Sequence, residues 1–156
     1  MENQVSIYTD GAARGNPGPG GYGIILFWKN VKKELSQGFR LTTNNRMELL
    51  AVIIALESLK RKNLQVTIHS DSSYVVNAIE KNWLQGWVKK NFKGKKNEDL
   101  WRRYLNVAKD QKVKFVWVKG HANNTWNNRC DELATAAADG NNLLIDEVYE
   151  NEKKSA

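Results

Sequence analysis

The chain of 156 residues contains only one cysteine, Cys130, so no intramolecular disulfide can form. Its first twenty residues include acids and glycines where a secretory signal peptide needs an apolar run. Both absences are typical of proteins that stay in a reducing compartment. We therefore expect a reduced, cytoplasmic protein.

Long hydrophobic runs are also absent. The longest wholly apolar stretch, Leu49 to Leu56, is far shorter than the roughly 20 residues that a membrane-spanning helix needs. No linker or low-complexity block divides the chain, and a hydrophobic content of 41% is enough for one complete core. These features predict a soluble single domain over residues 1–141. Residues 142–156 form a polar tail of mixed charge, and a frayed end is one interpretation of it.

Acidic residues are outnumbered, since 17 Asp and Glu stand against 24 Lys and Arg, for a formal net charge of +7. This balance favours a polyanionic partner, although many basic proteins have no role with nucleic acids. The imbalance is greatest from Lys81 to Lys96, which holds six lysines, no acid, and the aromatic residues Trp83, Trp87 and Phe92. Lysines attract phosphates, and aromatic rings pack on sugars or bases. The alternative is a solvated lysine face whose tryptophans enter the core.

Two short strands end in aspartate. Val5 to Asp10 alternates between two faces, and Val66 to Asp71 repeats its pattern, so that Ile-x-x-Asp occurs twice. If the two strands lie side by side and parallel, both carboxylates emerge at the edge where open α/β sheets bind ligands. We expect regular pairing to stop at Asp10, because Gly11 follows directly.

The connection after Asp10 is rich in residues that form turns. Gly11 to Gly23 holds six of the eleven glycines and both prolines. It lacks the Gly-Lys-Ser/Thr ending of a nucleotide-binding P-loop, and a β-like segment, Tyr22 to Lys29, follows instead of a helix. The pattern favours a wide hairpin loop, which either approaches a phosphate or sugar closely or is only a flexible turn. A third, antiparallel strand is expected over Val31 to Leu41.

From Thr43 the hydrophobic period becomes helical, and the helix is apolar on almost every side. Glu48 is the only charged residue between Met47 and Leu56. Its charge needs compensation, because burying an unpaired carboxylate costs on the order of several kcal/mol. One interpretation makes Glu48 the capping-box partner of Asn45, and the other places it in a cluster with the two strand-end aspartates.

Further segments complete the pattern. Ser72 is expected to cap a helix, and another helix is expected over residues 98–108. Residues 112–119 are expected to form the last strand, followed by a polar loop with His121 and a helix with Asp131 in an early turn. A lone aspartate there is usually a partner of the helix dipole, and a lone histidine in a loop is usually just exposed.

Several motifs along the chain resemble those of one known family. They are Tyr-Thr-Asp10-Gly, the glycine-rich run from Arg14 to Gly23, Thr-Thr-Asn-Asn-Arg-Met-Glu48, Ser-Asp71-Ser-Ser-Tyr, Gly-His121, and Arg-Cys-Asp131-Glu-Leu-Ala. Their order and spacing from Val5 to Ala138 are similar to those of bacterial type 1 ribonuclease H. The whole series carries far more weight than any single motif.

The resemblance implies an α/β, ribonuclease H-like fold, with a five-stranded mixed sheet whose first three strands are antiparallel and with helices around it. It implies a monomeric endonuclease that hydrolyses the RNA strand of RNA/DNA hybrids and leaves 5′-phosphate and 3′-hydroxyl ends. Two Mg2+ ions, or Mn2+ as a substitute, would make a cluster of anions tolerable. The ligands would be Asp10, Glu48, Asp71 and Asp131, and His121 matches the family's catalytic loop histidine.

The family's substrate contacts carry over only where its motifs stand. Asn16, Asn44 and Asn45 match positions that meet the minor groove, and Thr43 matches one that holds a DNA phosphate. Ser73 stands where many relatives have glutamine, and its shorter hydroxyl puts that base-edge contact in doubt. The basic segment resembles the family's basic protrusion, with these expected contacts: Trp83, Trp87, Lys89, Lys90, Lys93, Lys95 and Lys96.

Two other classes of function stay open at this point. A binding module would keep the fold and the basic segment but lose the chemistry, and the presence of all four carboxylates argues against it. Another nuclease of the wider fold, such as an integrase or a proofreading exonuclease, would also cluster carboxylates around metals. The basic segment and the His121 loop favour ribonuclease H.

Overall fold

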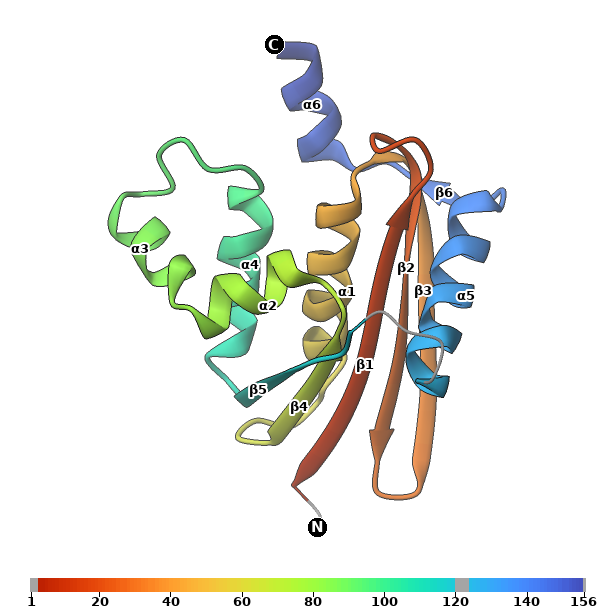
Figure 1. The fold of residues 1–156 in the computed structure, drawn as a ribbon, viewed down its shortest axis with the longest axis vertical. Helices are drawn as coiled ribbons and strands as arrows, with labels where there is room; N and C mark the ends of the chain where they lie inside the picture. Colours follow the sequence, from red (N-terminus) through yellow and green to blue (C-terminus); the bar gives the residue numbers. More distant parts are fainter. Residues whose placement is uncertain (1–2, 120–123, 156) are drawn as a thin grey trace.

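The computed structural model describes residues 3–119 and 124–155, in which one mixed sheet is flanked by helices (Figure 1). The strands lie in the order β5-β4-β1-β2-β3-β6. The strands are β1 (Gln4–Ala13), β2 (Gly18–Trp28), β3 (Val31–Thr42), β4 (Gln65–Ser70), β5 (Lys112–Trp117) and β6 (Leu143–Leu144). The helices are α1 (Asn44–Glu57), α2 (Ser73–Glu80), α3 (Trp83–Lys89), α4 (Glu98–Ala108), α5 (Thr125–Asp139) and α6 (Glu147–Ser155).

The ribonuclease H-like α/β fold expected from the motifs is confirmed. β1, β2 and β3 form an antiparallel meander, and β4 and β5 extend the sheet in parallel. The expected number of five strands is wrong, because a sixth, β6, pairs in parallel with Gly38 and Phe39 of β3. A strand of two residues is too short to show an alternating pattern in the sequence.

The two strands that end near aspartate lie side by side and parallel, as predicted, with Tyr8 opposite His69. Their aspartates therefore lie at the same edge of the sheet. The expectation that β1 stops pairing at Asp10 is wrong, because Asp10 lies opposite Gly23 and β1 stays paired with β2 as far as Ala13. Only the pairing with β4 ends before the aspartate.

The wide hairpin loop expected over Gly11 to Gly23 is also wrong, because β2 already begins at Gly18. Most of these glycines lie in strands, where they permit close packing. A Cβ at Gly21 or Gly23 would overlap the backbone of α5, so both residues let that helix approach the sheet.

α1 and α5 cover opposite faces of the sheet, and α2, α3 and α4 lie on the side of α1 (Figure 1). The predicted all-round burial of α1 is confirmed, because the helix lies between the sheet and α4. Its fully buried residues are Arg46, Met47, Leu49, Ala51, Val52, Ile53, Ala55 and Leu56. Among residues 3–119 and 124–155, no helix combines the length and apolarity that crossing a membrane requires.

The C-terminal segment is folded, in contrast to the frayed tail that its polar composition allowed. It carries β6 and α6, and two of its carboxylates are buried against distant arginines. Arg46 Nε lies 2.7 Å from Asp146 Oδ2, and Arg40 Nη2 lies 2.8 Å from Glu150 Oε1. These ion pairs fix the segment against α1 and β3. Composition missed them because the partners lie about 100 residues apart in the chain.

Candidate active site

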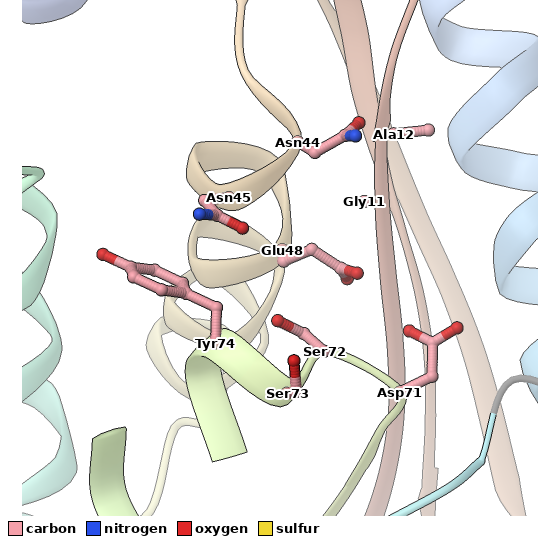
Figure 2. A pocket seen from close by; sticks show the side chains of 9 residues that line it. All are labelled: Gly11, Ala12, Asn44, Asn45, Glu48, Asp71, Ser72, Ser73 and Tyr74. Atoms are coloured by element: carbon pink, nitrogen blue, oxygen red, sulfur yellow. The ribbon is translucent and has the colours of Figure 1, made fainter. Parts of the chain in front are cut away.

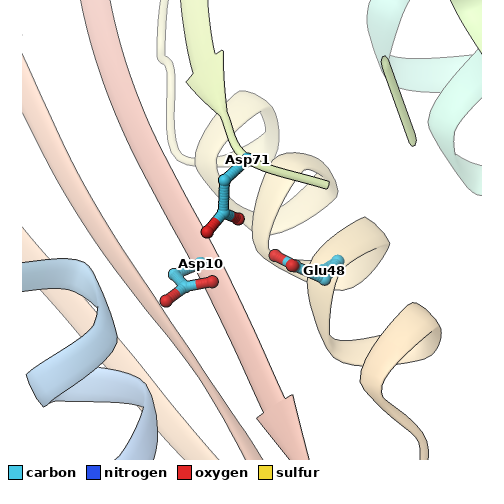
Figure 3. Close-up of side chains that lie close together, drawn as sticks. All are labelled: Asp10, Glu48 and Asp71. Atoms are coloured by element: carbon cyan, nitrogen blue, oxygen red, sulfur yellow. The ribbon is translucent and has the colours of Figure 1, made fainter. Parts of the chain in front are cut away.

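The structure brings together three of the four carboxylates that the motifs singled out. Asp10 lies on β1, Glu48 on α1, and Asp71 directly after β4, and their side chains point toward one another (Figure 3). One carboxylate oxygen of each residue lies within 4.8 Å of one from each of the others. Three anionic groups therefore share a space in which each can act on the others.

Gly11 allows α1 to come this close to β1. A Cβ at Gly11 would overlap the backbone nitrogen of Glu48, so any other residue would push the helix away from the strand. The Gly11 amide also donates a hydrogen bond of 2.9 Å to Asp10 Oδ1. Sequence analysis missed this role, although a glycine directly after a strand-end aspartate was a visible signal.

Helix caps position the other two carboxylates. Thr43 caps α1, since its hydroxyl oxygen accepts a hydrogen bond of 3.2 Å from the Arg46 amide. The interpretation of Glu48 as a capping-box partner of Asn45 is therefore wrong. Ser72 caps α2 as predicted, with its hydroxyl oxygen accepting from Val75 N, and this turn begins directly after the strand-end aspartate.

Burial and mutual repulsion shift the acidity of the cluster. Burial, followed by the charge of Asp71, raises the pKa of Asp10 to about 8. Burial and the charges of its two neighbours raise the pKa of Glu48 well above its ordinary value, and burial raises the pKa of Asp71. Glu48 Oε1 and Asp71 Oδ1 are enclosed and have no hydrogen-bond partner in the described part of the chain. The cluster therefore needs either protons or a cation.

A divalent cation fits this cluster on chemical grounds. Carboxylate oxygens are the protein ligands that Mg2+ and Mn2+ prefer, and a cation would provide the missing partner for both enclosed oxygens. It would also reverse the effect of burial on the pKa values, because a nearby positive charge favours the ionised carboxylate.

Asp131 and His121 complete the catalytic set expected from the motifs. Asp131 lies on α5, is exposed, and is not part of the group of three, but its charge still contributes to the raised pKa of Asp10. It therefore lies near enough to Asp10 for the two charges to interact. His121 falls outside the described residues, so its catalytic role stays a prediction.

A polar pocket of about 430 Å³ opens beside Glu48 and Asp71 (Figure 2). Three predicted substrate residues line it, namely Asn44 and Asn45 at the start of α1 and Ser73 at the start of α2. Amide and hydroxyl groups thus lie beside the carboxylates, and both donors and acceptors are available to a polar ligand.

Hydrogen bonds join the β1–β2 connection to the start of α1. The side-chain oxygen Asn44 Oδ1 accepts a hydrogen bond of 2.5 Å from the backbone N–H of Ala13. The backbone N–H of Asn44 donates a hydrogen bond of 3.0 Å to Asn16 Oδ1. The side chain of Asn16 is therefore held beside the first turn of α1. The contact joins two predicted substrate residues, Asn16 of the glycine-rich run and Asn44 of α1.

A second pocket, of about 540 Å³, adjoins the first, and Asn45 lines both. Asn16 and Thr43 line it together with Lys95 and Lys96 of the basic segment. Five predicted substrate residues thus surround one hollow, although they come from three separate parts of the sequence.

The remaining predicted contacts lie away from the linings of these two pockets. Trp83 is 46% exposed, whereas Trp87 packs against Trp101 with ring centroids 5.7 Å apart. The alternative interpretation, in which the tryptophans enter the core, thus holds for Trp87 but not for Trp83, and Phe92 is buried in the core as well. The lysines are exposed and stay predicted contacts: Lys89, Lys90 and Lys93.

Comparison with known proteins settles the family. The family model described as RNase H matches residues 2–139. The chain belongs to the ribonuclease H family. It is 53% identical to ribonuclease H of Desulforamulus reducens over 148 residues, with 92% of each chain covered. It is 49% identical to ribonuclease H of Shewanella halifaxensis, over 98% of this chain and 97% of the relative. The resemblance seen in the motifs is thus confirmed.

Solved structures of ribonuclease H proteins share the fold. LC9-RNase H1, described as a type 1 RNase H with the type 2 active-site motif, has a TM-score of 0.81 and 28% identity over 97% of this chain and 81% of its own. LC11-RNase H1 in complex with an RNA/DNA hybrid has a TM-score of 0.59 and 26% identity over 86% of this chain and 96% of its own.

Proposed function

We propose that this chain is an endonuclease that hydrolyses the RNA strand of RNA/DNA hybrids and leaves 5′-phosphate and 3′-hydroxyl ends. The observation that carries the proposal is the convergence of Asp10, Glu48 and Asp71 within 4.8 Å, in a chain of the ribonuclease H family. A binding module would have no use for buried anions that repel one another.

The cluster would hold two divalent cations, Mg2+ or its substitute Mn2+, through Asp10, Glu48, Asp71 and Asp131. Bound there, such ions would supply Lewis-acid chemistry, by which an attacking water would become more acidic and the charge on the phosphate would be stabilised. The influence of Asp131 on the pKa of Asp10 supports its role as the fourth ligand. His121 would accept a proton or help to release product.

The two pockets suit the backbone and groove of a duplex. Asn16, Asn44 and Asn45 offer amide donors and acceptors for sugar and base edges, and Thr43 offers a hydroxyl for a phosphate. The hydroxyl of Ser73 would reach a base edge through water, because it is shorter than the amide of glutamine. The exposed lysines would add attraction to phosphates without reading sequence.

A substrate comparison tests the reaction. Labelled RNA/DNA hybrid, duplex DNA and duplex RNA are offered with Mg2+ and with EDTA, to wild type and to Asp71→Asn. We expect internal cuts in the hybrid RNA alone, only with Mg2+ and only by wild type, from a protein that elutes as a monomer. Cutting of duplex DNA would indicate another nuclease of the wider fold, and binding without cutting would indicate a binding module.

Salt dependence tests the lysines. Changing five lysines of the basic segment to glutamine should lower the slope of log affinity against log salt by roughly one unit per lost phosphate contact, and should raise KM with kcat at saturation nearly unchanged. The changed residues are Lys89, Lys90, Lys93, Lys95 and Lys96. The control removes the same charge from exposed lysines elsewhere: Lys60, Lys62, Lys109, Lys112 and Lys114. Equal effects of both variants would make the segment a solvated surface.

A further inference from the structure

The C-terminal helix α6 forms one wall of the second pocket. Tyr149, Glu152 and Lys153 line this pocket together with Lys95 and Lys96. Figure 1 shows α6 above the N-terminal end of α1, near the connection between β1 and β2. α6 lies outside the stretch that carries the family motifs, yet it lines the same pocket as residues that the motifs predicted to contact the substrate.

The position of α6 is fixed by buried groups at its base. Arg46 is 2% exposed, and it donates hydrogen bonds to Asp146 at 2.7 and 3.0 Å and to Asp99 at 2.7 and 2.9 Å. Its guanidinium also lies 6.0 Å from the centroid of the Tyr149 ring. One buried cation thus ties the start of α6 to α1 and to the first turn of α4, so the wall of the pocket is built into the fold.

The charge of the pocket suits a phosphate backbone. Three ammonium groups line it against the single carboxylate of Glu152. Lys153 Nζ lies 6.0 Å from the centroid of the Tyr149 ring, and Lys153 forms no salt bridge with any residue in the described ranges. Its charge is therefore available to a ligand, and it lies beside an aromatic ring that can pack on a sugar.

We propose that α6 belongs to the nucleic-acid-binding surface, with Lys153 contacting a backbone phosphate away from the cleavage position. The inference rests on the proposed function, because a duplex cut at the carboxylate cluster would continue from the first pocket into the second, along Asn45. Such a contact positions the duplex without touching the reacting atoms, so it contributes to binding and to its salt dependence.

The test compares Lys153→Gln with Lys154→Gln in the full-length protein. Lys154 is the next residue on the exposed helix, is absent from the pocket lining, and lies near enough to Glu150 for its charge to help lower the pKa of that carboxyl. Both variants lose one positive charge. Binding of uncut hybrid is measured by fluorescence anisotropy across a salt series, cleavage by KM and kcat, and folding by the urea midpoint.

We expect Lys153→Gln to weaken hybrid binding about threefold to tenfold at low salt and to reduce the salt slope by roughly one unit. Its kcat and urea midpoint should equal those of wild type, and Lys154→Gln should change the slope much less. With hybrids shortened until they no longer reach α6, Lys153→Gln and wild type should bind alike.

Equal salt slopes for the two variants, or an effect of Lys153→Gln that persists on the shortest hybrids, would overturn the role of α6. This outcome is distinct from failure of the proposed function. If wild type binds hybrid but does not cut it, the catalytic proposal fails while the binding comparison still decides the role of Lys153.

Discussion

Replacing Asp10 by asparagine removes one charge from the carboxylate cluster at nearly constant volume. Two full charges no more than 4.8 Å apart repel by about 3.5 kcal/mol or more at an effective dielectric constant of about 20. Protonation relieves part of this repulsion near neutral pH, because the pKa of Asp10 is raised to about 8. Without metal, Asp10→Asn should therefore be more stable than wild type, by at least about 3 kcal/mol at high pH.

The raised pKa determines how this difference depends on pH. Between the ordinary pKa of 3.8 and the raised value of about 8, folded Asp10 retains a proton that the unfolded chain releases. Wild-type stability must therefore fall as the pH rises through this window. Asparagine does not titrate, so the extra stability of Asp10→Asn over wild type should be small near pH 3.8, grow as the pH rises, and level off above about pH 8.

Mg2+ should reverse the order of stability. An ion that binds only the folded state adds RT ln(1 + [Mg2+]/Kd), which is about 2.7 kcal/mol at 100 times Kd. Wild type should gain this amount, whereas Asp10→Asn lacks one ligand and should gain less. The variant should also lose hybrid cleavage while it still binds hybrid, because asparagine retains the volume but not the charge of the ligand.

Urea unfolding at about pH 5, 7 and 9, with EDTA or Mg2+, measures these differences. Asp139→Asn is the matched control, since Asp139 is an exposed carboxylate whose pKa is lowered by its hydrogen bond from Arg14. That control should not gain stability at any pH. The reasoning is refuted if Asp10→Asn is no more stable than wild type at high pH without metal, or if Mg2+ leaves wild type unchanged.

Three further substitutions test the site and its support. Gly11→Ala should cost about 1–3 kcal/mol of stability and slow cleavage, because the added Cβ overlaps the backbone of α1 and the helix must move. Arg46→Leu should cost about 3–5 kcal/mol in urea unfolding, because it leaves carboxylates without their buried cation. His121→Ala should slow turnover by ~10² to 10⁴-fold, leave measurable activity, and change the pH profile of kcat.

The two substitutions that test packing and the buried ion pair each have a contrasting control. Gly86→Ala adds a Cβ that meets nothing within 4 Å, so it should not destabilise the protein as Gly11→Ala does. Arg14→Leu breaks an ion pair whose arginine side chain is 53% exposed, and it should cost no more than about 1 kcal/mol. Equal losses within either pair would contradict the packing or ion-pair argument. An unchanged pH profile would remove His121 from the mechanism.

Local pattern was enough to place two members of the carboxylate cluster together, and it left two interpretations open for the third, Glu48. The alternating pattern before Asp10 and the same pattern before Asp71 each depend on a few neighbouring residues, and so does the helical periodicity around Glu48. Placing the first two together required only the rule that parallel strands end at a common edge, and β1 and β4 obey it. For Glu48 the argument was that burying an unpaired charge is costly, so its carboxylate had to serve as a helix cap or belong to a cluster.

Tertiary structure decided what depends on partners far apart in the chain. The overlap that makes Gly11 necessary exists only because α1 crosses β1 at that residue, and composition alone indicated a loop there. The polar composition after Asn141 is typical of a frayed end. In the structure this segment is held by the ion pair between Asp146 and the buried Arg46, which lies 100 residues earlier in the chain. Periodicity reports which face of an element is buried, but it carries no information on which distant charge lies opposite, so only the folded chain shows that α6 lines the second pocket.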